Sequence, residues 1–201
     1  TGVQTCALPI CYLNVGINEQ SMLGIAAGFA RNGFRPFVYS IANFPTFRAL
    51  EQIRNDINYM NLPVSIISVG AGLSYGTAGY THHLIEDISI MRIFENIKIF
   101  SPVDKKEARV LLRDSLNYNN PAYFRLGKGG EAIFESTKIM KEEGVSCFKK
   151  GQHGNIIFTG GIADEVIEAA KILNNIGIFP SVYSVSIIDK ILIKKILNFL
   201  P

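Results

Sequence analysis

The sequence predicts an α/β protein with a mostly parallel sheet that helices cover on both faces. Short apolar segments rich in β-branched residues alternate with segments that carry apolar residues at helical spacing. Glycine, proline or asparagine punctuates the joins between them. In open sheets of this class, ligands bind beyond the carboxyl ends of the strands, so functional residues are expected in the turns that follow the strands.

The predicted helices have recognisable ends. The first ends before Gly33, a typical C-terminal cap, and the second follows Asn43 and Pro45, which suit a helix N-terminus. Asp104 and Glu107 have the spacing of a capping box. Helices are therefore expected at 19–32, 43–60, 84–94, 104–116 and 164–174.

The predicted strands are short and apolar. Four glycines between the second strand and the next helix, at positions 70, 72, 76 and 79, indicate a loop, and loops on a rigid scaffold often carry function. Strands are expected at 36–41, 64–69, 97–100, 122–126, 155–159 and 181–185.

The pattern divides the chain into four parts. Residues 1–10 are interpreted as a non-native N-terminal segment and left out of the fold. Residues 11–130 form the main domain, and the glycine-rich residues 131–154 are interpreted as a linker with a small hairpin. Residues 155–201 begin a second α/β domain, which is incomplete because a domain typically has about 100 to 150 residues.

Composition excludes several classes of protein. The chain has 201 residues, 48% of them hydrophobic, and a net charge of +3 from 20 basic and 17 acidic residues scattered along it. Neither nucleic acid nor membrane binding is expected, because there is no strong basic patch and no apolar run of about 18 to 20 residues. Cys6, Cys11 and Cys147 lack metal-ligand spacing, which predicts no metal site in this chain and free thiols in the cytoplasm.

Glu19 carries a carboxyl group at an expected strand-to-helix junction, where an apolar segment, 12–15, gives way to the first helix. Such a group is a candidate for proton transfer. It can equally serve only to stabilise the helix N-terminus, which contributes roughly 0.3 to 1 kcal/mol. The spacing alone leaves both interpretations open.

Three motifs in order carry a resemblance. They are Asn14–Gln20 (NVGINEQ), Arg48–Asp56 (RALEQIRND) and Thr81–Asp87 (THHLIED). Together they resemble the pyrimidine-binding domain of the thiamine-diphosphate enzymes of the transketolase family. The similarity covers about residues 12–130, and 155–201 are similar to the start of that family's C-terminal domain. The loop sequence YGTAGYTHH, residues 75–83, resembles that of transketolase-like proteins encoded as split subunits.

The resemblance implies thiamine diphosphate as cofactor. Glu19 matches the glutamate that shares a proton with the cofactor's aminopyrimidine and so favours loss of the thiazolium C2 proton. Phe44 matches the aromatic residue that stacks on the aminopyrimidine, and Tyr39 is expected to line the same pocket. His82 matches a catalytic histidine that faces the reacting carbon and contacts substrate. His83 is expected to orient the loop.

Substrate contacts are implied less completely. Arg48 and Lys128 are the other expected substrate-binding residues, with Lys128 in place of a phosphate-binding arginine. Transketolases that act on sugar phosphates commonly have an aspartate four residues before the loop histidine, where it binds a substrate hydroxyl. This chain has Ala78 there, so the resemblance does not imply specificity for ordinary ketose phosphates. Glu86 and Asp87 are expected to start a helix and hold the loop.

The family's Gly-Asp-Gly and Asn-Asn motif for the diphosphate and Mg²⁺ has no counterpart in the sequence. The resemblance therefore implies that a diphosphate-binding N-terminal domain or subunit holds the Mg²⁺, in a homo-oligomer or hetero-oligomer such as a dimer.

The expected function is transfer of a two-carbon ketol unit between sugar phosphates or related carbohydrates, by one half of a split or truncated enzyme. Three alternatives remain: the β subunit of a 2-oxo acid dehydrogenase, a 1-deoxyxylulose 5-phosphate synthase-like enzyme, and a non-catalytic scaffold subunit. The motif Thr81-His82-His83 favours the transketolase interpretation over the dehydrogenase.

Overall fold

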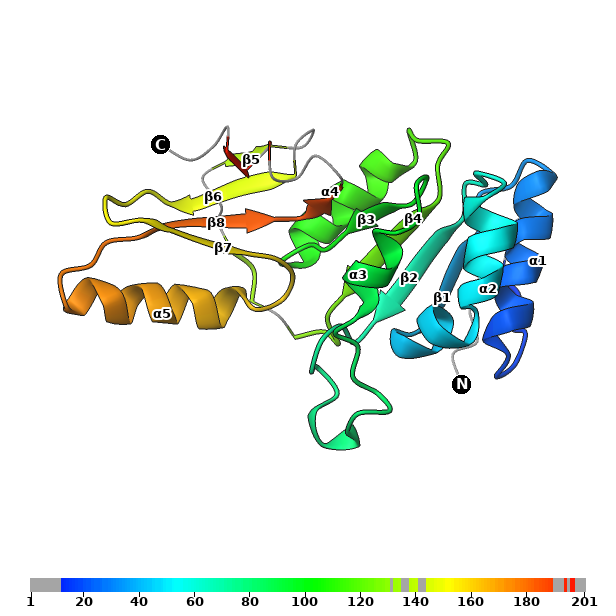
Figure 1. Ribbon diagram of the computed structural model, residues 1–201, viewed down its shortest axis with the longest axis horizontal. Coiled ribbons are helices and arrows are strands. Elements are labelled where there is room, and N and C mark those ends of the chain that lie inside the picture. Colours follow the sequence, from blue (N-terminus) through cyan, green and yellow to red (C-terminus); the bar gives the residue numbers. More distant parts are fainter. Residues whose placement is uncertain are drawn as a thin grey trace.

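The computed structural model describes residues 12–130, 132–134, 138–140, 144–189, 194 and 196–197. Its first sheet is parallel except for one antiparallel edge strand, which confirms the predicted fold class (Figure 1). The strand order is β1 (Phe37–Ile41), β2 (Ser65–Val69), β4 (Ala122–Leu126), β3 (Lys98–Phe100) and β9 (Ile187–Ile188). The expected non-native residues 1–10 lie outside the described part.

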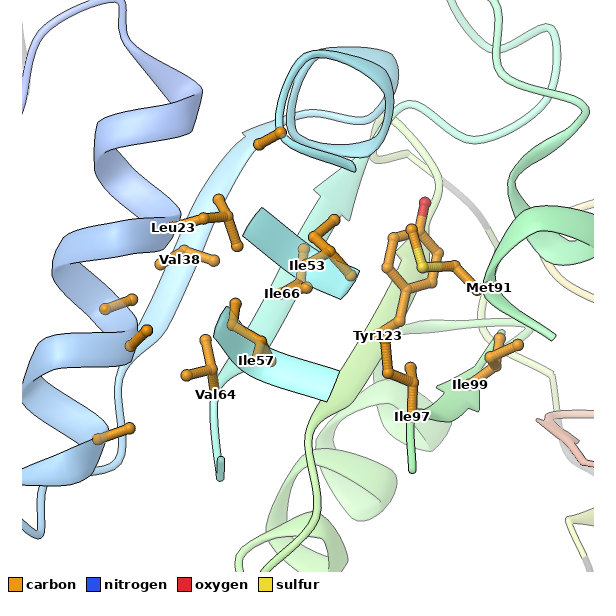
Figure 2. Close-up of a cluster of buried hydrophobic side chains, with 14 of the residues drawn as sticks. Leu23, Val38, Ile53, Ile57, Val64, Ile66, Met91, Ile97, Ile99 and Tyr123 are labelled. Atoms are coloured by element: carbon orange, nitrogen blue, oxygen red, sulfur yellow. The ribbon is translucent and has the colours of Figure 1, made fainter. Parts of the chain in front are cut away.

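Helices cover both faces of this sheet. The larger cluster of buried apolar side chains lies under α1 (Glu19–Arg31), α2 (Leu50–Gln52) and α3 (Asp87–Met91), as Figure 2 shows. On the other face, Leu111 of α4 (Lys105–Ser115) packs in a cluster with Phe100 and Phe124, whose stacked rings have centroids 4.7 Å apart. None of the described helices is both long and apolar enough to span a membrane.

Two predicted helices differ from the observed ones. The segment expected as one helix at 43–60 contains π-helical turns, η1 (Phe44–Arg48) and η2 (Ile53–Asn58), on either side of α2. In η1 the Thr46 hydroxyl donates to the Ala42 carbonyl at 2.7 Å and so competes for an acceptor of the helical ladder. Wide turns of this kind occur often at functional sites.

The helix expected at 84–94 is shorter, because Leu84 is held in an extended conformation. Leu84 and Gly72 exchange two backbone hydrogen bonds, of 2.7 and 2.9 Å, across an isolated antiparallel bridge. The helix α3 can therefore begin only at Asp87. The bridge closes the base of the glycine-rich loop, which contains one 3₁₀ turn, η3 (Gly76–Ala78).

The second sheet takes in part of the expected linker. Its order is β5 (Lys138–Met140), β6 (Val145–Lys149), β8 (Ser181–Val185) and β7 (Asn155–Phe158). The hairpin expected within 131–154 is present as β5 and β6, but β6 also pairs with β8, so this segment is not only a linker. Strands β7 and β8 are parallel and joined through α5 (Ala163–Asn175).

Strand β9 joins the two parts of the chain. It follows β8 directly and pairs with β3 of the first sheet, Ile99 opposite Ile188 and Phe100 opposite Ile187. A two-residue strand is too short to give a periodic signal, so the sequence does not predict it.

Glu107 of α4 lies buried between the two parts. Its carboxylate accepts the Val103 backbone N–H at 2.8 Å and lies 3.5 Å from the Ser146 hydroxyl of β6. Asp104 caps the helix by accepting the Glu107 N–H at 2.8 Å, as the capping box predicts, but Glu107 bonds to Val103 rather than to Asp104 itself. Burial raises the pKa of Glu107, and the hydrogen bond from Val103 opposes this effect.

The buried Glu107 predicts stability that falls as pH rises. With a raised pKa, the folded protein keeps this proton to higher pH than the unfolded chain, so the free energy of unfolding decreases upward from about pH 4.5, the ordinary value. It levels off above the folded pKa. Glu107→Gln cannot ionise, and it should gain stability relative to wild type between pH 4 and pH 7 in urea unfolding followed by circular dichroism. Exposed Glu168→Gln is the matched control, and an equal pH profile for Glu107→Gln and wild type would contradict the assignment.

Candidate functional site

The expected site residues gather where several strands end. Phe44 follows β1, and the loop that bears His82 follows β2. Glu19 is the first residue of α1, where Asn18 caps the helix by accepting the Ser21 N–H at 3.1 Å. The strand expected before Glu19 is absent, because residues 12–18 pair with none of the described strands and all except Val15 lie exposed.

Glu19 is a buried acid, only 8% exposed, and its carboxylate has two polar neighbours. One carboxylate oxygen lies 3.4 Å from the Ser40 hydroxyl of β1. The other lies 3.3 Å from a guanidinium nitrogen of Arg48 in η1. The Arg48 guanidinium carbon in turn lies 4.4 Å from the centroid of the Phe44 ring. Glu19, Phe44 and Arg48 therefore form one cluster.

His82 belongs to the same cluster. Its ring centroid lies 5.5 Å from that of Phe44 and 5.8 Å from that of Tyr75. The Thr81 hydroxyl lies 3.0 Å from His82 Nδ1, and the Asn43 side-chain amide donates to the Thr81 carbonyl. These contacts dock the glycine-rich loop on the start of η1 and fix where the imidazole lies.

His83 holds the loop, as the sequence predicts. Its Nε2 lies 2.8 Å from the Gly76 carbonyl oxygen, which can only accept a hydrogen bond. Nε2 therefore carries the proton in this geometry. The two adjacent histidines have different partners, and only His82 contacts the Phe44 ring.

A buried polar network supports the cluster from below. Asp87 is completely buried and accepts the Arg125 Nε–H at 2.9 Å and the Tyr123 hydroxyl at 3.1 Å. The Tyr123 hydroxyl also lies 3.1 Å from that of Thr46, and Arg125 donates to the Leu84 carbonyl at 3.3 Å. Burial, and then the charge of Asp87, raises the pKa of the Tyr123 hydroxyl. The network ties η1 to the start of α3.

Sequence reasoning gave Asp87 a loop-holding role but missed Thr46, Tyr123 and Arg125. A signal was available for two of them. Tyr123 and Arg125 alternate with Phe124 along β4, so they face the same side of the sheet. That side is the one covered by α3, where Asp87 begins the helix.

Two expected residues lie outside this cluster. Tyr39 is 67% exposed and, by strand alternation, faces away from Ser40 and hence away from Glu19. The Lys128 Nζ lies 5.2 Å from the ring centroid of Tyr75, the loop tyrosine that contacts His82, and no ion pair or ring contact joins Lys128 to Glu19, Phe44 or His82 in the part of the chain that the structure describes. Ala78 is exposed in η3.

The cluster has the chemistry to hold a flat, nitrogen-rich ring. It offers a buried carboxylate and an aromatic face, and the planar guanidinium of Arg48 contacts both. The buried side-chain oxygen of Asn43 has no hydrogen-bond partner among the described residues, so an acceptor is available next to Phe44. Hydrogen-bond donors on a stacked heterocycle would satisfy these groups.

Comparisons with known proteins show which family this chain belongs to. Residues 9–130 match the family described as "Transketolase, pyrimidine binding domain". The chain is 36% identical over 174 residues to an apulose-4-phosphate transketolase subunit of Actinobacillus succinogenes, covering 86% of this chain and 56% of the relative. It is also 36% identical over 185 residues to the 1-deoxy-D-xylulose-5-phosphate synthase of Dictyoglomus turgidum, covering 88% of this chain and 29% of the relative.

A solved structure shares the fold. It is described as "Split gene transketolase, inactive beta4 tetramer" and superimposes with a TM-score of 0.75 at 35% identity. The match covers 86% of this chain and 56% of that one. This chain therefore spans about half the length of the split-subunit proteins that it matches. The predicted family resemblance is confirmed.

The buried network predicts a large effect for Asp87→Ala. Removing one partner of a buried ion pair leaves the other charge uncompensated, so the variant should lose about 3 to 5 kcal/mol of unfolding free energy. The matched control is Glu168→Ala, which removes the exposed pair of Glu168 with Lys171 at 3.2 Å and should cost roughly 0.5 kcal/mol or less. Urea unfolding measures both, and comparable losses would show that Asp87 does not support the fold in this way.

Proposed function

We propose, because this chain belongs to the transketolase family, that it is the pyrimidine-binding half of a thiamine-diphosphate-dependent transferase. The reaction is transfer of a two-carbon ketol unit between sugar phosphates or related carbohydrates. The observation that carries the proposal is the cluster of Glu19, Phe44 and His82, in which a buried acid, an aromatic face and an imidazole meet at the strand ends.

The residues present fit the cofactor's aminopyrimidine. Glu19 would bind a ring nitrogen and hold the shared proton, since its burial keeps water from competing for the carboxylate. Phe44 would supply the stacking face. When bound, thiamine diphosphate supplies the carbanion chemistry, which the protein only positions.

His82 would act on the substrate rather than on the cofactor. Its imidazole is held against Phe44 by the docked loop, so it can donate a hydrogen bond to a developing alkoxide or move a proton there. Lys128 and Arg48 remain proposed contacts for an anionic group of the substrate, whereas Tyr39 is not proposed as a pocket residue, because it faces away from Glu19. Intact chemistry at Glu19, Phe44 and His82 also opposes a purely non-catalytic scaffold.

A second polypeptide or domain completes the proposed enzyme. The relative from Actinobacillus is named as one subunit of a transketolase, and the related structure is described as an inactive assembly of β chains from a split gene. We propose that the diphosphate and Mg²⁺ are held by a partner of the N-terminal transketolase type, in an oligomer located in the cytoplasm.

A 1-deoxyxylulose 5-phosphate synthase is a second candidate, favoured by the 36% identity to the Dictyoglomus enzyme. Ala78 does not separate the two candidates, because the resemblance implies an aspartate at that position in both the synthase and ordinary transketolases. The two candidates separate when the assembled enzyme is assayed for ketol transfer and for formation of 1-deoxyxylulose 5-phosphate.

Glu19→Gln tests the proposed chemistry. The amide keeps the shape but cannot share the proton, so ketol transfer from a sugar phosphate by the chain assembled with its partner should fall by at least about 100-fold. The unfolding midpoint should stay near that of wild type. Exposed Glu168→Gln should keep full activity, and full activity of Glu19→Gln would remove Glu19 from the mechanism.

Partner dependence has its own test. In calorimetric titration with thiamine diphosphate and Mg²⁺, this chain alone should show no tight binding, and adding the partner should produce it. Tight binding to the isolated chain would contradict the split site.

A further inference from the structure

We propose that Arg48 is a built-in placeholder for the cofactor's aminopyrimidine: in the cofactor-free protein it occupies Glu19 and Phe44, and it must swing out before the cofactor binds. This inference rests on the proposed function. It gives Arg48 a role in cofactor entry, distinct from the substrate contact expected from the sequence.

The geometry puts Arg48 on both groups at once. One guanidinium nitrogen lies 3.3 Å from Glu19 Oε2, and the guanidinium carbon lies 4.4 Å from the Phe44 ring centroid. A guanidinium is flat, cationic and rich in N–H donors, and it stacks readily on aromatic faces. The aminopyrimidine is assigned the same two partners, so both cannot hold them together.

Arg48 reaches this position from within η1. It lies four residues after Phe44 in the same π-helical turn, so its side chain folds back over the ring of its own segment. The rest of the cluster is fixed independently: Glu19 by α1, and the loop that bears His82 by the contact between Asn43 and Thr81. Arg48 can therefore leave without disturbing the groups that would receive the cofactor.

Exposure indicates which partner moves. The Arg48 side chain is 54% exposed, whereas that of Glu19 is 9% exposed. A half-exposed ion pair gains little from its Coulomb attraction, because water solvates the arginine nearly as well after it leaves. The 3.3 Å separation is also longer than the 2.7 to 2.9 Å typical of strong charge-assisted hydrogen bonds. The contact is thus weak enough to be exchanged for a ligand.

A placeholder also explains how a buried carboxylate is tolerated before the cofactor arrives. An acid left without a partner in this environment would be costly. Arg48 supplies a counter-charge, together with the Ser40 hydroxyl at 3.4 Å. The same contact lowers the apparent affinity for the cofactor by the fraction of time that the site is closed.

The experiment compares Arg48→Met with wild type, each assembled with the diphosphate-binding partner. Methionine retains much of the side-chain bulk but can neither pair with Glu19 nor present a guanidinium to Phe44. Thiamine diphosphate, titrated calorimetrically at saturating Mg²⁺, should bind the variant roughly three- to tenfold more tightly, because the closed state is removed. Arg54→Met is the matched control, since Arg54 is exposed in η2 and bonds to neighbouring Asn55, and its affinity should not change.

A spectroscopic measurement tests the placeholder directly. In the cofactor-free protein, Glu19→Gln should shift the Arg48 Nε–H resonance, and adding thiamine diphosphate to the wild-type assembly should shift the same resonance. Equal or weaker cofactor binding by Arg48→Met would overturn the placeholder while leaving the proposed function intact. Failure of the wild-type assembly to bind thiamine diphosphate at all would instead overturn the proposed function.

Discussion

The candidate site depends on the hydrogen bonds of the Tyr123 hydroxyl. This hydroxyl lies buried between Thr46 of η1 and Asp87 at the start of α3, 3.1 Å from each. Thr46 lies in the turn that carries Phe44, and Asp87 ends the loop that carries His82. The phenol therefore links two segments that are far apart in the sequence and, together with the contact of Asn43 with Thr81, supports the 5.5 Å approach of Phe44 to His82.

Burial makes this constraint strong. Asp87 could not be buried as an anion unless its oxygens were satisfied, and Arg125 and Tyr123 satisfy them. The cost of breaking any one of these bonds is higher than in water, because the freed group has no solvent to turn to. The loop after β2 can thus be rich in glycine and still hold its histidine in place.

The sequence predicts the framework better than the site. Six of the strands expected from apolar runs are present within about one residue at each end, because local hydrophobic pattern decides them, but the segment 12–15 before Glu19 forms no strand. The helix at 84–94 is overestimated, since the Gly72 to Leu84 bridge is a tertiary contact with no local signal. Strand β9 and the pairing of β6 with β8 are missed for the same reason.

The site residues divide along similar lines. Glu19, Phe44, Arg48 and His82 follow from motifs, and the structure brings them together. Tyr39 is expected as a second aromatic residue lining the pocket, but strand alternation turns it to the opposite face. The Arg48 to Glu19 contact could not be predicted, because it depends on the π-helical turn that folds Arg48 back over Phe44.

Two acids in this fold show how burial separates a structural ion pair from an exchangeable one. Asp87 is paired with Arg125, whose side chain is only 13% exposed, so neither partner can leave without stranding a charge inside the protein. Glu19 is nearly as buried, but its partner Arg48 lies half in water. The first arrangement resists change and suits a scaffold. The second leaves a fixed acid with a replaceable partner, which is what a site that binds a cationic or donor-rich ring requires.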